Sequence, residues 1–268
     1  MEPDDFSIIY RMEQSDMSKE ITVQVNENIT LIQNSDGLTF GTDAYLLAAF
    51  TQGGTKKICA DLGSGTGIIP LLCALKNKFN KICAVEIQSE FAALIGRNAE
   101  INQLSDRVLP VLADVRDVTA STLGGEVDAV TSNPPYMKVD SGKRNLHDEK
   151  FIARHEVFGD IGDFCAAAER ILKFGGNFYT VWRPDRLSDL VYELRAHHLE
   201  PKLITFVHAT PQSQPSTVLV RSKKGAASGC TVTRPLFLHD NADCARQNKL
   251  SEDAEAIYAS CSFESFLK

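Results

Sequence analysis

The tetrapeptide Asn133-Pro134-Pro135-Tyr136 combines residue types that suit a flat ligand with an amino group, and it directly follows the apolar run 127–132. Two consecutive prolines cannot continue a strand or a helix, because each lacks an N–H and fixes φ. We therefore expect a strand to end here and to present the amide of Asn133 and the carbonyls of Asn133 and Pro134 to an external molecule. The ring of Tyr136 follows at once. Carbonyl acceptors, an amide and an aromatic ring together favour a planar substrate that carries an NH2 group.

A glycine-rich turn earlier in the chain predicts a second binding feature. Residues 61–67 have the sequence Asp-Leu-Gly-Ser-Gly-Thr-Gly and lie between a predicted strand and a predicted helix. Glycine in such a turn lets the backbone approach a ligand closely and adopt positive φ. Taken alone the pattern is weak evidence, since a tight turn without a ligand or a dinucleotide site would look similar.

Carboxylates at the ends of successive predicted strands make the glycine turn more specific. Glu86 ends the next strand, where it can accept hydrogen bonds from both hydroxyls of a ribose. Asp114 ends the third strand, where it can accept from the exocyclic amine of an adenine. A dinucleotide site has Gly-x-Gly-x-x-Gly, whereas this chain has Gly-x-Gly-x-Gly after Asp61, whose carboxylate can bind the amino group of a methionine moiety that NAD lacks. The predicted cofactor is therefore S-adenosylmethionine, and we expect it to be bound by Phe40, Thr42, Asp61, Gly63, Ser64, Gly65, Gly67, Glu86, Ile87, Asp114, Val115 and Asn133.

The composition predicts a globular cytoplasmic protein. Its 268 residues, 43% of them hydrophobic and 24% charged, allow one α/β domain of ordinary core size with small additions. No uninterrupted apolar run reaches the roughly 20 residues that a membrane span needs, and the acidic N-terminus lacks the features of a signal peptide. Seven cysteines without a Cys-x-x-Cys pair argue against a disulfide framework and a structural zinc site, and we expect no bound metal. Cys59 and Cys83 are expected in the core.

The net charge of −7 works against non-specific binding of nucleic acid. An RNA partner would therefore need a local basic patch. The chain offers one directly after the tetrapeptide, formed by Lys138, Lys143, Arg144, Lys150 and Arg154. This segment is either a solvated loop or an RNA contact, and its position beside the tetrapeptide favours the second interpretation.

Alternating β-type and helical patterns position these residues. Strands are predicted at 58–62, 81–87, 108–112, 127–131 and 176–182, and helices at 68–75, after 87 through 101, at 161–172 and at 184–197. Repeating β-α units imply a mostly parallel sheet with helices on both faces, in which ligands bind beyond the carboxyl ends of the strands. Two later β-runs, at 203–208 and 216–221, predict an antiparallel hairpin.

The region before these units predicts a second hairpin and a helix. Short β-runs at 21–25 and 29–33 are separated by a turn signal. Asp43 is then expected to cap a helix at 44–50.

Residues 57–221 resemble the class I S-adenosylmethionine-dependent methyltransferases, because they carry the glycine turn, the three carboxylates and the tetrapeptide. The resemblance implies an α/β fold with a Rossmann-like seven-stranded, mostly parallel sheet, helices on both faces and a C-terminal antiparallel hairpin. We expect three parts: an N-terminal extension at 1–55 with a β-hairpin and a cofactor-covering helix, a methyltransferase core at 56–225, and a tail at 226–268 that packs on the core.

In that superfamily an (Asn/Asp)-Pro-Pro-(Tyr/Phe) motif after the fourth strand is typical of methylation on a conjugated amine. Such a nitrogen is a poor nucleophile, because its lone pair is delocalised. Hydrogen bonds from its N–H groups to the Asn133 side chain and the Pro134 carbonyl would draw it toward sp³ geometry, while Tyr136 would stack on the substrate. We predict catalytic roles for Asn133, Pro134 and Tyr136, and substrate contacts from Pro135, Lys138, Lys143, Arg144 and Arg154.

A finer resemblance implies which amine is methylated. The segments 38–50 and 153–156, the tetrapeptide and the tail from Pro235 are similar to bacterial tRNA (adenine-N6)-methyltransferases that modify valine tRNA beside the anticodon. The similarity spans about residues 20–260 and implies a tRNA partner. The family's functional residues have matching positions here at Asp61, Glu86, Asp114, Asn133 and Tyr136.

Other functions suit the same motifs. The glutamine amide of a release factor and guanine N2 in rRNA are alternative targets, and a cofactor-binding module without catalysis is a third possibility. The glutamine N5-methyltransferases carry a helical N-terminal domain, whereas the residues before this core are β-type, which favours the tRNA enzyme. The oligomeric state is not predicted.

Overall fold

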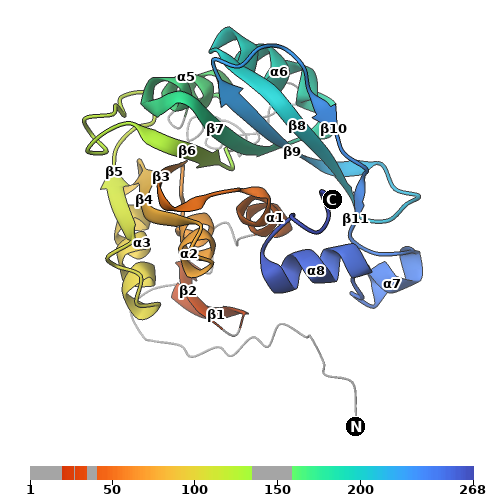
Figure 1. Ribbon diagram of the computed structural model, residues 1–268. Coiled ribbons are helices and arrows are strands. Elements are labelled where there is room, and N and C mark those ends of the chain that lie inside the picture. Colours follow the sequence, from red (N-terminus) through yellow and green to blue (C-terminus); the bar gives the residue numbers. More distant parts are fainter. Residues whose placement is uncertain (1–19, 27, 35–40, 135–158) are drawn as a thin grey trace, which may run out of the picture.

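The computed structural model describes residues 20–26, 28–34, 41–134 and 159–268, and its centre is a mixed sheet (Figure 1). Among these residues the sheet has nine strands in the order β10-β8-β9-β7-β6-β3-β4-β5, with β11 also paired to β8. The strands are β3 (Gly54–Leu62), β4 (Phe79–Glu86), β5 (Val108–Leu112), β6 (Val127–Ser132), β7 (Leu172–Trp182), β8 (Leu199–His208), β9 (Pro215–Lys224), β10 (Thr231–Val232) and β11 (Leu236–Phe237). Of these described strands only β9 runs antiparallel to its neighbours, which are β7 and β8.

The predicted α/β class and mostly parallel sheet are confirmed, but the sheet has more strands than the seven expected. The additional strands β10 and β11 have 2 residues each, which is too short for a period-2 pattern to be recognised in a sequence. The other strands correspond to the predicted β-runs, although β3, β7 and β8 begin at 54, 172 and 199, where the pattern predicts 58, 176 and 203.

Alternating side chains along the central strands create one apolar core on each face of the sheet. In β4, Ile82 and Ala84 belong to one core, whereas Cys83 and Val85 belong to the other. The first core is covered by α1 (Thr42–Phe50), α2 (Ile68–Leu75) and α3 (Ser89–Ile101), and the second by α5 (Ile161–Ile171) and α6 (Leu187–Ala196). Cys59 and Cys83 are buried in these cores, as the sequence predicts. The helix predicted at 184–197 begins as a short 3-10 turn, η1 (Pro184–Arg186), before α6.

The predicted N-terminal hairpin is formed by β1 (Glu20–Asn26) and β2 (Ile29–Asn34), and it is attached to α3 by two asparagines. Asn98 Oδ1 accepts from the Ile32 N–H at 2.7 Å and its Nδ2 donates to the Ile32 carbonyl at 3.0 Å. One helical turn later, Asn102 makes the same pair of bonds with Thr30, at 2.9 and 2.7 Å. The match arises because two residues of a strand and four residues of a helix both advance about 6–7 Å. The two amides thus replace a neighbouring strand along β2.

The segment after β9 packs against the first core. β10 and β11 extend the sheet beside β8, and they are followed by α7 (Ala242–Arg246) and α8 (Glu252–Ser260). The rings of Tyr45 in α1 and Tyr258 in α8 stack with centroids 4.7 Å apart, and the Tyr45 hydroxyl donates to the Tyr258 carbonyl at 2.7 Å. Within the described ranges, none of the helices has the length and apolarity required to span a membrane.

Replacing Asn98 by alanine is expected to lower the free energy of unfolding by about 2–4 kcal/mol, because one buried and two half-buried backbone partners lose their hydrogen bonds. These partners are both polar groups of Ile32 and the Thr66 carbonyl, which accepts from Asn98 Nδ2 at 2.9 Å. Urea unfolding measures the loss. Asn102→Ala serves as the control, because its side chain lies on the same helix face but is only half-buried. An Asn98→Ala protein no less stable than Asn102→Ala would contradict the assignment.

Candidate active site

Four polar residues lie side by side where adjacent parallel strands end. Asp61 is the second-last residue of β3, and Glu86 is the last residue of β4. Asp114 follows β5, and Asn133 follows β6. Because the strand order is β6-β3-β4-β5 and all four strands are parallel, these residues share one edge of the sheet. This is the edge at which open α/β sheets bind ligands.

The glycine turn at this edge leaves room for a ligand at its middle. Gly65 has a φ of 54°, and a Cβ built on it meets no atom within 4 Å. Gly67, with a φ of 85°, lies instead against α3, where a Cβ would come within 3.2 Å of Ile95. The turn is tied to β4, since the N–H groups of Gly63 and Ser64 both donate to the Val85 carbonyl at 3.0 Å. Glycine is therefore needed at position 67 for packing, and at 65 the backbone is open to a ligand.

Asp61 is buried with one carboxyl oxygen satisfied and the other not. Its Oδ1 accepts from the Thr131 hydroxyl at 2.6 Å, across the β3–β6 pair, and the side chain is 1% exposed. Among the described residues Oδ2 has no hydrogen-bond donor. Burial raises the pKa of Asp61 from 3.8 to about 7. The side chains of Thr131 and Ser64 oppose this rise, and the charge of Glu86 reinforces it. A cationic group that reached Oδ2 would restore the missing hydrogen bond and favour the ionised form.

Glu86 holds the glycine turn in place, a role that its predicted ribose contact does not include. Its Oε2 accepts from the Gly65 N–H at 2.9 Å, and its Oε1 accepts from the Gln88 N–H at 3.0 Å. The side chain is 5% exposed. An ionised carboxylate can accept about four hydrogen bonds, so Glu86 keeps acceptor capacity for ribose hydroxyls.

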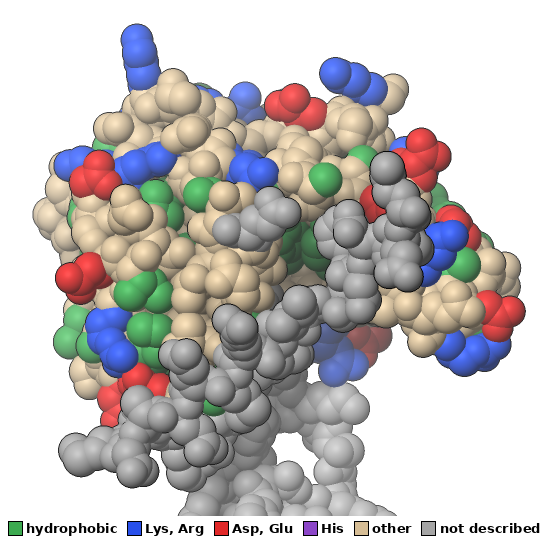
Figure 2. Space-filling view, turned by 90° about the horizontal axis from the view of Figure 1, so that it is seen from below, with side chains coloured by type: hydrophobic (Ala, Val, Ile, Leu, Met, Phe, Trp, Pro, Cys, Tyr) green, Lys and Arg blue, Asp and Glu red, His purple; other side chains and the backbone are tan. Residues whose placement is uncertain are grey.

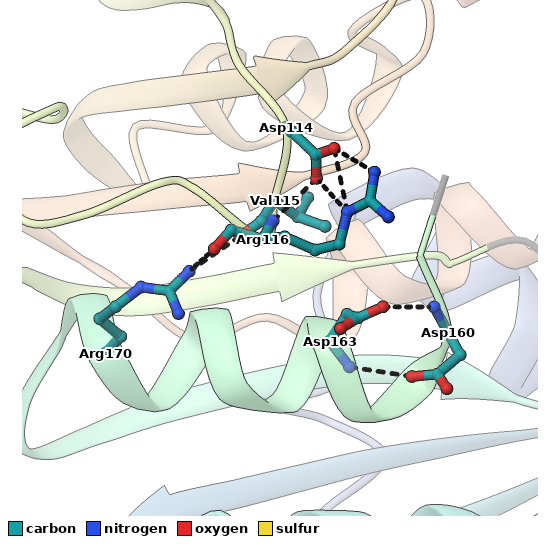
Figure 3. A network of polar contacts seen from close by, with 6 residues as sticks. All are labelled: Asp114, Val115, Arg116, Asp160, Asp163 and Arg170. Atoms are coloured by element: carbon teal, nitrogen blue, oxygen red, sulfur yellow. Dashed lines mark hydrogen bonds and ion pairs between the residues drawn. The ribbon is translucent and has the colours of Figure 1, made fainter. Parts of the chain in front are cut away.

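Asp114 lies two residues beyond the end of β5, where it forms an ion pair with Arg116 (Figure 3). Arg116 Nε lies 2.9 Å from Oδ1 and 3.0 Å from Oδ2, and its guanidinium lowers the pKa of Asp114. The loop that carries both residues is fixed by Arg170 of α5, which donates to the carbonyls of Val115 and Val118 at 2.9 and 2.7 Å. An adenine amine at the predicted position would therefore compete with Arg116 for the Asp114 carboxylate. Arg116 was not identified from the sequence.

Asn133 and Pro134 lie directly beside the glycine turn. Asp61 and Thr131 are opposite each other in the β3–β6 register, and the Ser132 hydroxyl donates to the Leu62 carbonyl at 2.8 Å. Asn133 is half-buried and Pro134 is buried. The other predicted site residues Phe40, Pro135, Tyr136, Lys138, Lys143, Arg144 and Arg154 lie outside the described part of the chain.

The expectation that Asp43 caps α1 is wrong. Gly41 occupies the N-cap position without a side-chain bond, and the helix begins at Thr42, which is exposed. Asp43 lies in the first turn, and its Oδ1 accepts from the Thr217 hydroxyl at 2.9 Å. The Asp43 carboxylate therefore binds Thr217 of β9 and does not cap the helix. No sequence pattern indicates a partner so distant along the chain.

Within the described ranges, no group of three or more His, Cys, Asp or Glu side chains could hold a metal ion.

Comparison with known proteins places these features in context. The family model for the methyltransferase small domain matches residues 34–193. A tRNA1(Val) (adenine(37)-N6)-methyltransferase of Porphyromonas gingivalis is 28% identical over 193 residues, which cover 70% of this chain and 75% of the relative. The enzyme of that name from Dyadobacter fermentans is 25% identical over 236 residues, 87% of this chain and 95% of the relative. Among solved structures, a predicted O-methyltransferase of Agrobacterium tumefaciens shares the fold with a TM-score of 0.66, at 21% identity over 82% of this chain and 97% of that one.

The stability of the ligand-free protein is expected to depend on pH through Asp61. Because its folded-state pKa of about 7 lies above the unfolded value of 3.8, the folded protein binds the extra proton between these values. The contribution is thus fully present below pH 4 and is lost as pH rises to 7, by about 4 kcal/mol. The buried thiols of Cys59 and Cys73 do not titrate in this range, since burial raises their pKa. Urea unfolding of wild type and Asp61→Asn at several pH values measures the difference.

Asp114→Asn is the control for this experiment. Arg116 lowers the pKa of Asp114, so its stabilising contribution is present above the unfolded pKa and is lost as pH falls. The two variants should therefore differ from wild type with opposite pH dependence. An Asp61→Asn protein whose stability changes with pH as wild type does would contradict the buried, protonated carboxyl.

Proposed function

Because the chain belongs to the methyltransferase small domain family, we propose that it transfers a methyl group from S-adenosylmethionine to N6 of an adenine in tRNA, next to the anticodon. The curated relatives named above are described as enzymes of that activity on adenine 37 of tRNA1(Val), which supports this target. The observation that carries the proposal is the β3–β6 register, which sets Asn133 and Pro134 beside the glycine turn and Asp61.

The residues at the strand ends fit the cofactor. The unsatisfied Oδ2 of Asp61 suits its ammonium group, and Glu86 has acceptor capacity for its ribose hydroxyls. The open space at Gly65 lets the backbone approach it closely. Asp114 would accept from the adenine amine once Arg116 releases it. When bound, S-adenosylmethionine supplies an electrophilic methyl group on a sulfonium sulfur.

The substrate nitrogen would be activated by acceptors rather than by a base. The Asn133 side-chain oxygen and the Pro134 carbonyl accept hydrogen bonds from its N–H groups, which concentrates the lone pair on nitrogen. The stacking role of Tyr136 belongs to the same proposal. Neither acceptor titrates near neutral pH, so positioning and electrostatics account for the rate enhancement.

The charge distribution bears on how RNA is held. On the face shown in Figure 2, Lys and Arg side chains lie interspersed with Asp and Glu over the described surface. The net charge of −7 opposes attraction of a polyanion. We therefore assign phosphate binding around the pocket mainly to the basic segment that contains Lys138, Lys143, Arg144 and Arg154.

One assay tests the proposed reaction. The protein is incubated with methyl-labelled S-adenosylmethionine and total tRNA, and the RNA is digested to nucleosides. Labelled N6-methyladenosine is the expected product. Label in N2-methylguanosine would contradict the adenine target, and label only in protein would indicate a glutamine methyltransferase instead.

Replacing Asn133 by alanine is expected to lower kcat by about 10²–10³-fold or more, because an acceptor used in the transition state is lost. The Kd for S-adenosylmethionine should change by less than about threefold, because Asn133 is expected to contribute less to the free energy of cofactor binding than one full hydrogen bond would. Calorimetric titration gives the Kd and nucleoside analysis gives kcat. Asn80→Ala, at an exposed position on the opposite edge of the sheet, is the control. Equal losses of cofactor affinity and kcat would refute the catalytic role of Asn133.

A further inference from the structure

A cavity of about 440 Å³ lies one strand away from the proposed methylation site. It is bounded by Trp182 at the end of β7, by Arg183 and Pro184 after it, by the start of β9 and by Asp43 in α1. Ser132 of β6 pairs with Thr180 of the parallel strand β7, so Trp182 is level with Pro134. The cavity therefore opens at the same carboxyl edge of the sheet, on the side away from the glycine turn.

The walls of this cavity are rigid. Trp182 is 3% exposed and its Nε1 donates to the Arg186 carbonyl at 3.0 Å. Pro184 and Pro215, whose φ angles are fixed, also line the cavity. The cavity is thus a formed feature of the fold, and its volume lies within the range of small-molecule sites.

The polar side chains that line the cavity include the carboxylate of Asp43 and the guanidinium of Arg183, together with Asp185, Ser216 and Thr217. The buried hydroxyl of Thr217 holds Asp43 Oδ1 at 2.9 Å, and no described residue donates to Asp43 Oδ2. Arg183 uses Nε and Nη2 for Asp185, at 2.9 and 2.7 Å. No described residue accepts from Arg183 Nη1. A carboxylate accepts from sugar hydroxyls, and a guanidinium donates to phosphate.

We propose that this cavity binds the nucleotide next to the target adenine, with its ribose 2′-hydroxyl on Asp43 and its phosphate on Arg183. The inference rests on the proposed function. Neighbouring strands are about 4.8 Å apart, so the cavity is within reach of the nucleotide adjoining one held at Asn133. Enzymes that act on a base extruded from its stack set their sequence context through flanking nucleotides. Recognition of the 2′-hydroxyl would also select RNA over DNA.

The test uses synthetic RNA stem-loops with the anticodon-arm sequence that the wild-type enzyme methylates, including versions with a single 2′-deoxy nucleotide on either side of the target. Asp43→Asn should raise KM for the unmodified stem-loop by about 10–100-fold, the effect of a lost hydrogen bond to a charged group. The Kd for S-adenosylmethionine should change by less than about threefold. On the stem-loop lacking the contacted 2′-hydroxyl, wild type and Asp43→Asn should have the same KM. Arg183→Gln should weaken all stem-loops equally.

Asp106→Asn, an exposed residue at the amino end of β5, makes the same charge change on the opposite edge and should leave KM unaltered. If Asp43→Asn and a deoxy substitution raise KM independently, so that their fold-changes multiply at both flanking positions, the cavity does not bind the ribose. A weakening of S-adenosylmethionine binding by Asp43→Asn would assign the cavity to the cofactor and overturn the proposal. Wild type must first be shown to methylate the unmodified stem-loop. If it does, the outcomes above concern the cavity alone; if it does not, both the proposed function and the cavity proposal are overturned.

Discussion

The hydrogen bond between Asp61 and Thr131 is the contact on which the arrangement of the site depends. It joins the carboxyl in β3 to the neighbouring strand β6 at 2.6 Å, in surroundings from which water is excluded. Burial of this carboxyl favours its protonated form and raises its pKa to about 7. The same register that makes this bond sets Asn133 beside the glycine turn. In the proposed reaction, the sheet itself would thereby fix the groups that bind cofactor and substrate relative to each other.

The glycine turn is held from two further directions. Glu86 accepts from the Gly65 N–H on the β4 side, and Asn98 of α3 donates to the Thr66 carbonyl on the other. Because Asn98 also binds the backbone of β2, the N-terminal hairpin is coupled to the turn through a single amide. The turn is therefore organised by contacts of the protein alone, which lowers the ordering cost that ligand binding must offset.

Much of this arrangement could be predicted from sequence, because parallel strands bring their carboxyl ends to one edge. Alternation of apolar residues indicated the longer strands, and the shared edge of the acidic residues at their ends could be predicted from these strands. What escaped prediction depends on tertiary contacts. Arg116 binds Asp114 within the loop after β5, whose backbone carbonyls accept from Arg170 of α5, and no sequence pattern marked this loop geometry. Asp43 was expected to be a cap, but Thr217, 174 residues away, takes its carboxylate. The 2-residue strands β10 and β11 are too short to carry a pattern.

In the proposed reaction, the buried carboxyl of Asp61 ionises to receive the cationic end of S-adenosylmethionine. Calorimetric titration at pH 6 in two buffers with different ionisation enthalpies measures it most directly, because the difference in heat gives the protons released. With a pKa of about 7 in the free protein, wild type should release close to one proton per cofactor bound. Asp61→Asn should release almost none. Equal proton release by the two proteins, or none by wild type, would contradict the account.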